Sequence, residues 1–439
     1  MPRPKVGAQP PPPPKAKPKA IKWSERQQAE RRLQRLLSFQ IVQKWRGDAS
    51  SACLGKLDWS AIESVVYIAG GSGGVMLARF NGPPGPPRLC CLKPQRMEAA
   101  GELCASILAN ALQVRTAPLQ VVPMSSDTEQ AIREAQLAID DHRVYLDRLL
   151  AGAKHLGVVE FVHGPMMEGQ EFVQFFEEGS GRLDRFWFEA GILVAFDCLI
   201  NNLDRLPIIW DNAGNLKNLM VEPDSGGLKV VGIDQAVRGI SAASGLERYV
   251  EQLRQLLQVV LGSDTDWLES PFLLRVQRAM QANFQDKFTV HAPALKLGLR
   301  QAFRQFAWRW CSGALGQSLD EALNQVMATF GGSAAQVGPL RQLVEVAAAT
   351  IAEEVEKIEL GMMPGPVLKI FRKLIPSGQL TWDELVRLLH LLDPQLEGDQ
   401  VKKFLSNAFS EPEVLVDCSE FLLLIWEGRP TVCQASTTM

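Results

Sequence analysis

The stretch Phe196-Asp-Cys-Leu-Ile-Asn-Asn-Leu-Asp-Arg-Leu-Pro207 places an aspartate, Asp204, in a loop directly after an apolar helix. Two asparagines begin this loop, and Pro207 ends it because proline fixes its own backbone torsion. A carboxylate at such a helix-to-loop junction is positioned to accept a proton from an attacking hydroxyl group. The stretch therefore predicts that Asp204 is a catalytic base.

Two predicted strands follow the loop and carry oxygen-donating side chains. They cover Gly214–Val221 and Val230–Val237 and are separated by a turn at 222–227. The two strands present Asn218 and Asp234, and Mg²⁺ takes hard oxygen ligands together with substrate phosphate. We therefore expect Asn218 and Asp234 to be metal ligands. Taken singly, each residue has a turn or helix-cap role as its alternative.

A glycine run lies on the N-terminal side, between the strand-like segments Ser64–Ile68 and Val75–Phe80. Backbone N–H groups of such a run can close over phosphates without obstruction by side chains. A hairpin turn is the alternative interpretation of the same composition. The expected phosphate-binding residues are Gly70, Gly71, Ser72, Gly73 and Gly74.

Lys93 ends the next short strand, Leu89–Lys93, which completes a predicted three-stranded antiparallel unit. If the first two strands form a hairpin, Lys93 faces the same cleft as the glycine run and is placed to hold nucleotide phosphates. The following predicted helix, Glu98–Leu112, carries Glu98 and Glu102 four residues apart and so on one face. Either glutamate is a candidate partner for Lys93.

The order of these features decides the fold class. Phosphoryl transfer on a kinase scaffold needs a particular order of parts, and this chain has that order. The parts are a glycine loop, a strand lysine, a helix glutamate, a loop aspartate, a strand asparagine and a final aspartate. After a strand at Val158–Val162 the chain is mostly helical to about Gly361. We therefore predict an α+β, two-lobed protein-kinase-like fold with a small antiparallel β N-lobe, a larger mainly helical C-lobe and a small all-α module at the C-terminus.

These motifs resemble those of the atypical kinases related to the catalytic domain of actin-fragmin kinase and, more distantly, of the type II phosphatidylinositol 4-kinases. The specific part is Asn201-Asn-Leu-Asp-Arg-Leu-Pro207 followed by Trp210, Gly214-Asn215 and Asn218, and the likeness covers about residues 58–260. The other matching stretches are Ile68-Ala-Gly-Gly-Ser-Gly-Gly-Val75, Leu92-Lys-Pro94, Glu102 with Ala105-Ser106, and Ile233-Asp234.

The resemblance implies a role for each side chain. Lys93 would contact the phosphates of ATP, Glu102 would position Lys93, and Asp204 would be the catalytic base. Asn218 and Asp234 would hold Mg²⁺. The hinge whose backbone meets adenine would consist of Glu160, Phe161 and Val162.

The chain departs from ordinary protein kinases in several places. It has no His-Arg-Asp motif, Asp204 and Asn218 are fourteen residues apart, and Asp-Gln-Ala stands at 234–236. No Ala-Pro-Glu motif follows, so we do not expect ordinary activation-loop control. The chain also carries no β-propeller repeats that would recruit actin.

We therefore predict a cytoplasmic, ATP- and Mg²⁺-dependent serine/threonine-protein kinase that phosphorylates a protein hydroxyl. An actin-cytoskeleton protein is the acceptor that the resemblance suggests. Two alternatives stay open. One is a phosphoinositide kinase of the same fold, and the other is a nucleotide-binding pseudokinase scaffold.

The C-terminal sixty residues resemble a degenerate EF-hand pair, with predicted helices at 367–374, 381–391, 399–409 and 418–426. If Glu384 is the twelfth loop position, Gly378 is the sixth and Leu380 the eighth, but Lys373 and Ile375 occupy the first and third ligand positions. In the second loop Glu420 would be twelfth, Val416 eighth and Phe409 first. We expect a module that binds an apolar helix, with Leu33–Trp45 of this chain as a candidate; a purely structural appendage is the alternative.

Charge is distributed unevenly over the 439 residues. Residues 1–47 carry a net charge of +10, so the remaining 392 residues carry −13 of the overall −3. The basic end predicts peripheral contact with an acidic membrane surface, and we expect no nucleic acid partner. The lack of an apolar run, of a signal peptide and of a cysteine framework favours a reduced, cytoplasmic protein. The predicted units are a disordered Pro/Lys-rich tail (1–22), a basic amphipathic helix (23–47), a kinase N-lobe (48–162), a kinase C-lobe (163–361), a degenerate EF-hand-like pair (362–430) and a tail (431–439).

Overall fold

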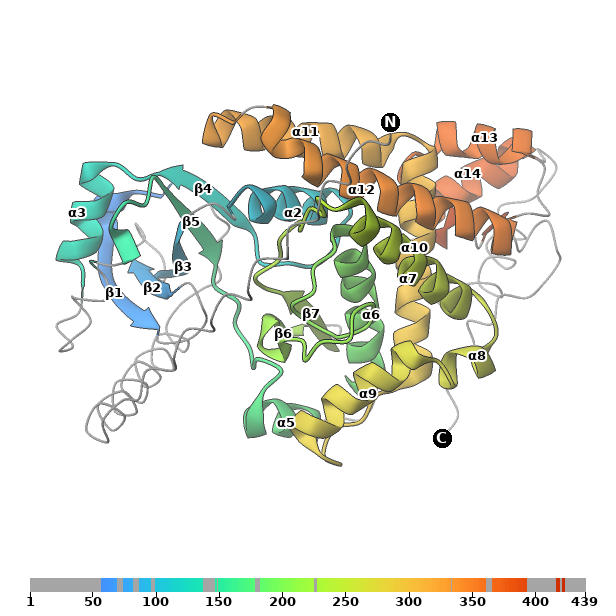
Figure 1. Ribbon diagram of the computed structural model, residues 1–439, viewed down its shortest axis with the longest axis horizontal. Coiled ribbons are helices and arrows are strands. Elements are labelled where there is room, and N and C mark those ends of the chain that lie inside the picture. The colour runs from blue at the N-terminus through green and yellow to red at the C-terminus, as the bar shows by residue number, and fades with distance from the viewer. Residues whose placement is uncertain are drawn as a thin grey trace, which may run out of the picture.

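The computed structural model shows a β-rich part beside a larger helical part (Figure 1). The residues that it describes are 57–68, 74–81, 87–95, 99–136, 147, 149–177, 182–224, 227–332, 334–360, 365–392, 416–418 and 421–422. The predictions made for 1–22, 23–47, 399–409 and 431–439, and for Gly70, Gly71, Ser72 and Gly73, lie outside these residues. Within them, the mixed α+β organisation expected from the sequence is confirmed.

The β-rich part is a five-stranded antiparallel sheet. The expected three-stranded unit, β1 to β3, is extended by β5, which lies between β3 and β4. Lys93 on β3 is paired with Gly157 on β5. The strands are β1 (Ile62–Ile68), β2 (Val75–Phe80), β3 (Arg88–Gln95), β4 (Leu119–Pro123) and β5 (His155–Glu160), and the short 3₁₀ helix η1 (Trp59–Ala61) precedes β1.

The two faces of this sheet carry different apolar clusters. Successive strand residues point to opposite faces, so Leu92 and Lys93 lie on opposite sides. Leu92 packs in the cluster that helix α3 (Ser126–Glu134) covers with Ile132. The other cluster consists of Val66, Leu77, Leu89 and Phe161, with Cys91 packed against it. Lys93 lies two residues after Cys91 and four after Leu89 on the same strand, so it shares this second face.

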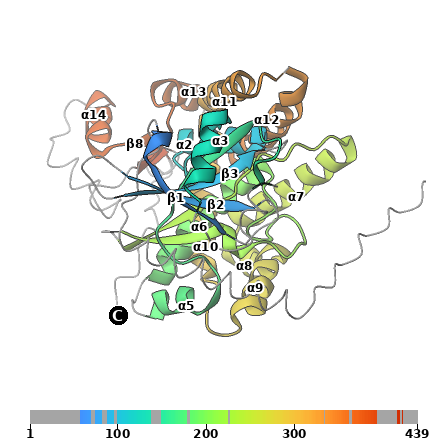
Figure 2. The same ribbon diagram turned by 90° about the vertical axis from the view of Figure 1, so that its left-hand side faces the viewer.

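Helix α6 (Arg182–Ile200) forms the centre of the helical part and crosses α10 (Ala292–Cys311) closely. Two glycines make the crossing possible, since a Cβ at Gly191 would lie 2.5 Å from the carbonyl oxygen of Leu295. Figure 2 looks onto the sheet, with the helical part behind it. The surrounding helices are α2 (Ala99–Ala111), α5 (Gly169–Glu177), α7 (Ala243–Leu261), α8 (Asp264–Leu268), α9 (Pro271–Phe284), α11 (Ala314–Phe330) and α12 (Ala334–Val355), which continues as a π-helical segment, η3 (Glu356–Leu360).

A short hairpin of β6 (Leu219–Asp224) and β7 (Gly227–Gly232) lies against α6. The predicted bounds of its strands, Gly214–Val221 and Val230–Val237, were wrong at both outer ends. The 3₁₀ helix η2 (Leu216–Asn218) comes before β6 because Asn218 N bonds back to the carbonyl oxygen of Asn215 at 3.0 Å. After β7 the chain leaves the ladder, since Asp234 has a left-handed φ of 60°.

Backbone pairing and one apolar cluster join the two parts of the molecule. Ala117 N donates to the carbonyl oxygen of Gly232 at 2.9 Å, and Gly232 N donates to that of Arg115 at 3.0 Å. Val162, just after β5, packs in a cluster with Met220 and Val231 of the hairpin. The sheet and the β6–β7 hairpin are therefore fixed relative to each other.

The described C-terminal elements pack on α10. They are α13 (Gly365–Leu374), β8 (Gln379–Leu380), α14 (Trp382–Leu392) and β9 (Val416–Asp417). Trp308 of α10 donates its indole N–H to the carbonyl oxygen of Ile375 at 2.7 Å. Strands β8 and β9 pair antiparallel, with Leu380 opposite Val416. None of the helices that the structure describes is long and apolar enough to cross a membrane.

Replacing Gly298 with alanine should destabilise the protein by about 1–3 kcal/mol, because overpacking a tight crossing forces the helices apart. A Cβ at this position would lie against the carbonyl oxygen of Phe188 on α6. The free energy of unfolding in urea measures the effect.

Gly316 on α11 provides the matched control, since a Cβ there would meet nothing within 4 Å. Gly316→Ala should stabilise the protein by about 0.5–1 kcal/mol through helix propensity alone. Equal effects of the two substitutions would contradict the close α6–α10 crossing.

Candidate active site

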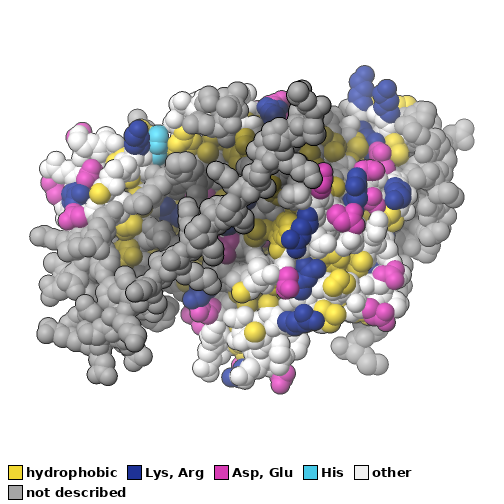
Figure 3. Space-filling view, viewed as in Figure 1, with side chains coloured by type: hydrophobic (Ala, Val, Ile, Leu, Met, Phe, Trp, Pro, Cys, Tyr) yellow, Lys and Arg dark blue, Asp and Glu magenta, His cyan; other side chains and the backbone are white. Residues whose placement is uncertain are grey.

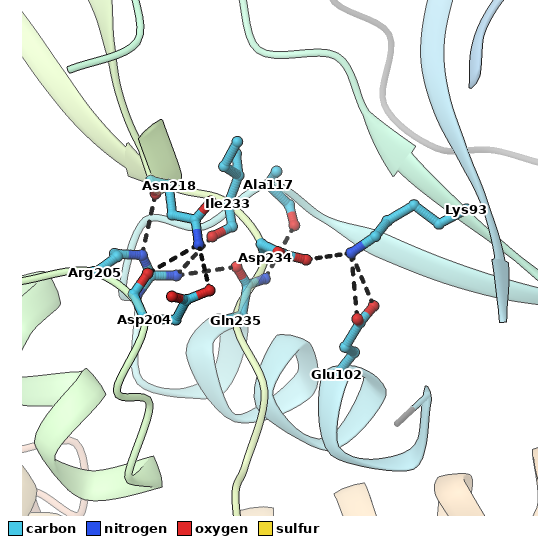
Figure 4. A network of polar contacts seen from close by, with 9 residues as sticks. All are labelled: Lys93, Glu102, Ala117, Asp204, Arg205, Asn218, Ile233, Asp234 and Gln235. Atoms are coloured by element: carbon cyan, nitrogen blue, oxygen red, sulfur yellow. Dashed lines mark hydrogen bonds and ion pairs between the residues drawn. The ribbon is translucent and has the colours of Figure 1, made fainter. Parts of the chain in front are cut away.

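Three charged side chains from distant parts of the chain meet between β3, α2 and the segment after β7 (Figure 4). Lys93 Nζ lies 3.2 Å from Oε1 and 3.4 Å from Oε2 of Glu102, in the first turn of α2. The same ammonium group also contacts Oδ1 of Asp234. The structure therefore pairs Lys93 with Glu102, whereas Glu98, the other candidate partner, lies outside the described residues.

The two carboxylates keep Lys93 protonated. Burial by itself would lower the pKa of Lys93, but the charges of Glu102 and Asp234 and the hydrogen bonds to both raise the pKa above its ordinary value. Because the pKa is raised, Lys93 is a cation throughout the neutral range. The stability that its ion pairs contribute is fully present below the unfolded-state pKa of lysine and is lost as pH rises through the higher folded-state pKa.

Both ends of α2 are held by other parts of the structure, which places Glu102. Near its N-terminus, Val237 N donates to the carbonyl oxygen of Gly101 at 3.0 Å. A Cβ at Gly101 would lie 2.6 Å from the carbonyl oxygen of Val237, so glycine permits this approach. At the other end, Arg309 of α10 donates to the carbonyl oxygen of Ala111. Glu102 is thus fixed relative to the loop that carries Asp234.

Asp204 and Asn218 lie side by side although fourteen residues separate them. Asn218 Nδ2 donates to the backbone oxygen of Asp204 at 2.9 Å and lies 3.3 Å from its Oδ2 atom. Asn218 was expected on a strand and instead ends η2. The 3₁₀ turn brings the Asn218 amide back onto the loop after α6. Asn218 and Asp204 are therefore neighbours, although the local structure differs from the expected strand.

The residue after Asp204, Arg205, is completely buried and joins the segments of the site. Its Nε donates to the carbonyl oxygen of Asn218 at 3.1 Å, and its Nη2 donates to that of Ile233 at 3.1 Å. Its Nη1 pairs with the carboxylate of Asp197 on α6. A guanidinium group presents its donors in a fixed planar fork, so three separate segments are held in one geometry.

Sequence reasoning did not select Asp197, Arg205 or Gln235 as site residues. Gln235 Oε1 lies 3.4 Å from Arg205 Nη2, and its amide nitrogen lies 3.4 Å from the carbonyl oxygen of Ala117. The available signal was Asp197 itself, a charge inside the apolar stretch 191–200. A buried carboxylate requires a partner, and an arginine follows eight residues later.

Asp234 adopts a backbone conformation that is uncommon for residues other than glycine. Its φ of 60° places it in the left-handed region, and such positions persist where surrounding contacts hold them. Here the preceding residue is bonded on both sides. Ile233 N donates to the carbonyl oxygen of Asn218 at 3.0 Å, and Ile233 O accepts from Arg205.

The expected adenine hinge lies where β5 ends. Phe161 belongs to the apolar cluster on the Lys93 face of the sheet, and Val162 belongs to the cluster that joins the two parts. Burial raises the pKa of Glu160, the nearby charge of Glu222 adds to this shift, and Arg115 opposes it. Of the expected glycine loop only Gly74 is described, with a φ of 72° that suits glycine.

The donor set has the chemistry that a magnesium ion takes. Asp204 and Asp234 offer carboxylate oxygens, and Asn218 offers an amide oxygen because its nitrogen is directed at Asp204. These side chains lie in one network with the Lys93 cation (Figure 4). The residues therefore suit a divalent cation such as Mg²⁺, which would add positive charge beside Lys93.

Arg205→Ala should destabilise the protein by about 3–5 kcal/mol, because it leaves Asp197 as a buried carboxylate without its counter-ion. In that background Asp197→Asn should recover part of the loss. A double-mutant cycle on the free energy of unfolding measures this coupling, and strictly additive costs would contradict it.

A comparison with known protein families gave a match over part of the chain. Residues 49–231 match the family model described as actin-fragmin kinase, catalytic. The match includes Lys93, Glu102, Asp204, Arg205 and Asn218 and ends three residues before Asp234. No curated protein matches the chain. Residues 49–231 are therefore similar to the catalytic domain of actin-fragmin kinase, which supports the resemblance to this atypical kinase family.

Proposed function

We propose that the protein is an ATP- and Mg²⁺-dependent kinase that transfers a phosphoryl group to a serine or threonine hydroxyl of a protein. The observation that carries the proposal is the network that joins Lys93, Glu102 and Asp234, whose lysine and aspartate are 141 residues apart in the chain. Together with Asp204 and Asn218 it assembles a cation, oxygen ligands and a base in one place.

The nucleotide would lie on the Lys93 face of the sheet. The adenine ring would be favoured there because Val66, Leu77 and Phe161 form an apolar cluster on the same face. Lys93 would neutralise phosphate charge, and Glu102 would keep its ammonium group extended. Because Lys93 stays protonated at neutral pH, this charge does not depend on small changes in pH.

Asn218 and Asp234 would hold Mg²⁺, which when bound neutralises negative charge on the phosphates. Asp204 would accept the proton of the acceptor hydroxyl at a carboxylate oxygen. Asn218 Nδ2, bonded to the Asp204 backbone and close to Oδ2, orients that carboxylate. Catalysis would then come mainly from positioning and charge neutralisation.

The acceptor class is the finer part of the proposal. The matched family is named after a kinase of actin-fragmin, which supports a protein acceptor and suggests one in the actin cytoskeleton. Transfer to phosphoinositide vesicles, or nucleotide binding without transfer, would support the lipid-kinase and pseudokinase alternatives instead.

Asp204→Asn should lower kcat by about 10²–10⁴-fold, the usual contribution of a positioned general base. Its affinity for Mg²⁺-ATP should change little, since Lys93 and Glu102 remain. Transfer of labelled phosphate from ATP to a protein extract measures the first effect, and equilibrium binding of a fluorescent ATP analogue measures the second.

Asp286→Asn is the matched control, because Asp286 is an exposed carboxylate in the loop after α9. This variant should transfer phosphate at the unaltered rate. If the unmutated chain binds ATP but transfers phosphate to neither proteins nor lipids, the kinase proposal fails. Equal activity of Asp204→Asn would instead show that the base is assigned to the wrong residue.

We also propose that the C-terminal segment is an EF-hand-like module without calcium chemistry in its first loop. Its support is the antiparallel pairing of Leu380 with Val416, the two residues expected at the eighth positions. Glu384 serves as a helix cap, since its Oε2 accepts hydrogen bonds from Thr381 N and Oγ1 at 2.8 Å each. This reciprocal arrangement is a capping box.

Glu384→Gln should therefore leave calcium binding by the full chain unchanged and cost at most about 1 kcal/mol of stability through the weaker cap. Titration calorimetry with Ca²⁺, with thermal unfolding alongside, checks both statements. Saturable calcium binding that disappears in this variant would contradict the proposal.

A further inference from the structure

Four arginines near the loop that carries Asp204 have no carboxylate partner among the described residues. They are Arg238, Arg248, Arg275 and Arg278, here named the arginine surface. None of them has an Asp or Glu oxygen within 4.0 Å among the residues that the structure describes. Arg238, Arg248 and Arg278 are exposed, and Arg275 is half-buried.

Three of these arginines are attached directly to the loop 201–212. The backbone oxygen of Arg238 accepts from Asn201 Nδ2 at 3.0 Å. The guanidinium group of Arg248 lies over the ring of Trp210, 5.5 Å from its centroid. Arg275 Nη1 donates to the carbonyl oxygens of Ile208 at 2.8 Å and Ile209 at 2.6 Å. The guanidinium groups of Arg248 and Arg275 are therefore held beside the segment that carries Asp204, and the backbone of Arg238 is bonded to the same loop.

Several other arginines of the described structure have acidic partners. Arg133, Arg254 and Arg341, for example, each contact carboxylates within 4.0 Å. Residues 48–439 carry a net charge of −13, so the arginine surface is a local concentration of positive charge on an acidic body. Figure 3 shows Lys and Arg side chains gathered over α7 and α9, on the face seen in Figure 1.

The surroundings of the arginine surface include an aromatic ring and a nearby aspartate. Trp210 is half-exposed, and a small pocket beside it is lined by Asn202, Leu203 and Asn212. Burial lowers the pKa of the Arg275 guanidinium group, the charge of Asp211 opposes this shift, and the charge of Arg278 adds to it. An extended peptide with several carboxylates fits spaced cations beside an aromatic ring, whereas one compact phosphate headgroup requires cations that converge on a point.

We propose that the arginine surface binds the acceptor and selects a protein segment with Asp or Glu residues close to the phosphorylated hydroxyl. The proposal deepens the proposed kinase function and rests on it for the role of the bound segment. The binding itself does not require phosphate transfer. The interaction is electrostatic, so it weakens as added salt screens the charges.

The test uses two fluorescent serine peptides that differ only in their flanking residues, glutamates in one and lysines in the other. Fluorescence anisotropy with the full chain at low salt should show tighter binding of the glutamate peptide. The double variant Arg238→Glu/Arg248→Glu should weaken this binding about tenfold or more, and Arg238→Lys/Arg248→Lys should retain most of it. Both variants should keep the unfolding midpoint of the unmutated chain, because the two side chains are exposed.

Lys369→Glu is the matched charge reversal, on the exposed surface of α13 away from the loop. It should leave both peptide affinities unchanged. Equal affinities for the two peptides, or an equal loss in the Lys369 variant, would overturn the proposal. Loss of binding to phosphatidylinositol-phosphate vesicles in the double variant, with peptide binding intact, would overturn it in favour of a lipid headgroup.

A second measurement separates this proposal from the kinase function. If the glutamate peptide binds through the arginine surface but receives no phosphate from Mg²⁺-ATP, the surface stands and the kinase function fails. If both peptides are phosphorylated with equal kcat/KM, the kinase function stands and the arginine surface is overturned.

Discussion

The buried guanidinium group of Arg205 is the constraint on which the catalytic geometry depends. A charge with no exposure to water needs a counter-ion and hydrogen bonds, and Asp197 together with two backbone carbonyl oxygens supplies them. Those partners come from α6, η2 and the end of β7. The hydrogen bonds and ion pair of the Arg205 side chain therefore position three segments. Asp204 and Asn218 are neighbours of these bonds, and the left-handed turn at Asp234 follows directly after one of them.

A second constraint acts across the two parts of the molecule. Helix α2 lies next to the sheet in sequence, yet Gly101 and Ala111 bond to the helical part at Val237 and Arg309. The ion pair of Lys93 and Glu102 is therefore formed against a helix that is held at both ends. Arg309 also donates to the carbonyl oxygen of Ser377 at 3.2 Å, so the C-terminal elements share this anchor. Arg309 thus links the end of α2 to a segment more than 250 residues away in the chain.

Much of the local structure could be predicted from the sequence. The strands around 64–68, 75–80 and 89–93 and the helix around 98–112 were placed within a few residues, since alternation and helical spacing of apolar residues are local signals. The hairpin after Asp204 was placed less well. Asn218 and Asp234 read as strand residues because apolar neighbours flank them, whereas tertiary bonds to Arg205 and Ile233 end the ladder on both sides.

The sequence by itself determined which chemical groups are present and in what order: a lysine, a glutamate, an aspartate, an asparagine and a final aspartate, spaced as a kinase scaffold requires. It also determined that Asp197 is a charge within an apolar helix. Only the tertiary structure decided that Glu102 is the partner of Lys93 among the described residues, that Arg205 joins the site from within the core, and that the arginines at 238, 248 and 275 surround one loop. These are contacts between residues far apart in the chain. They depend on how the helices pack and on which buried charges neutralise each other, and a local sequence pattern does not specify either.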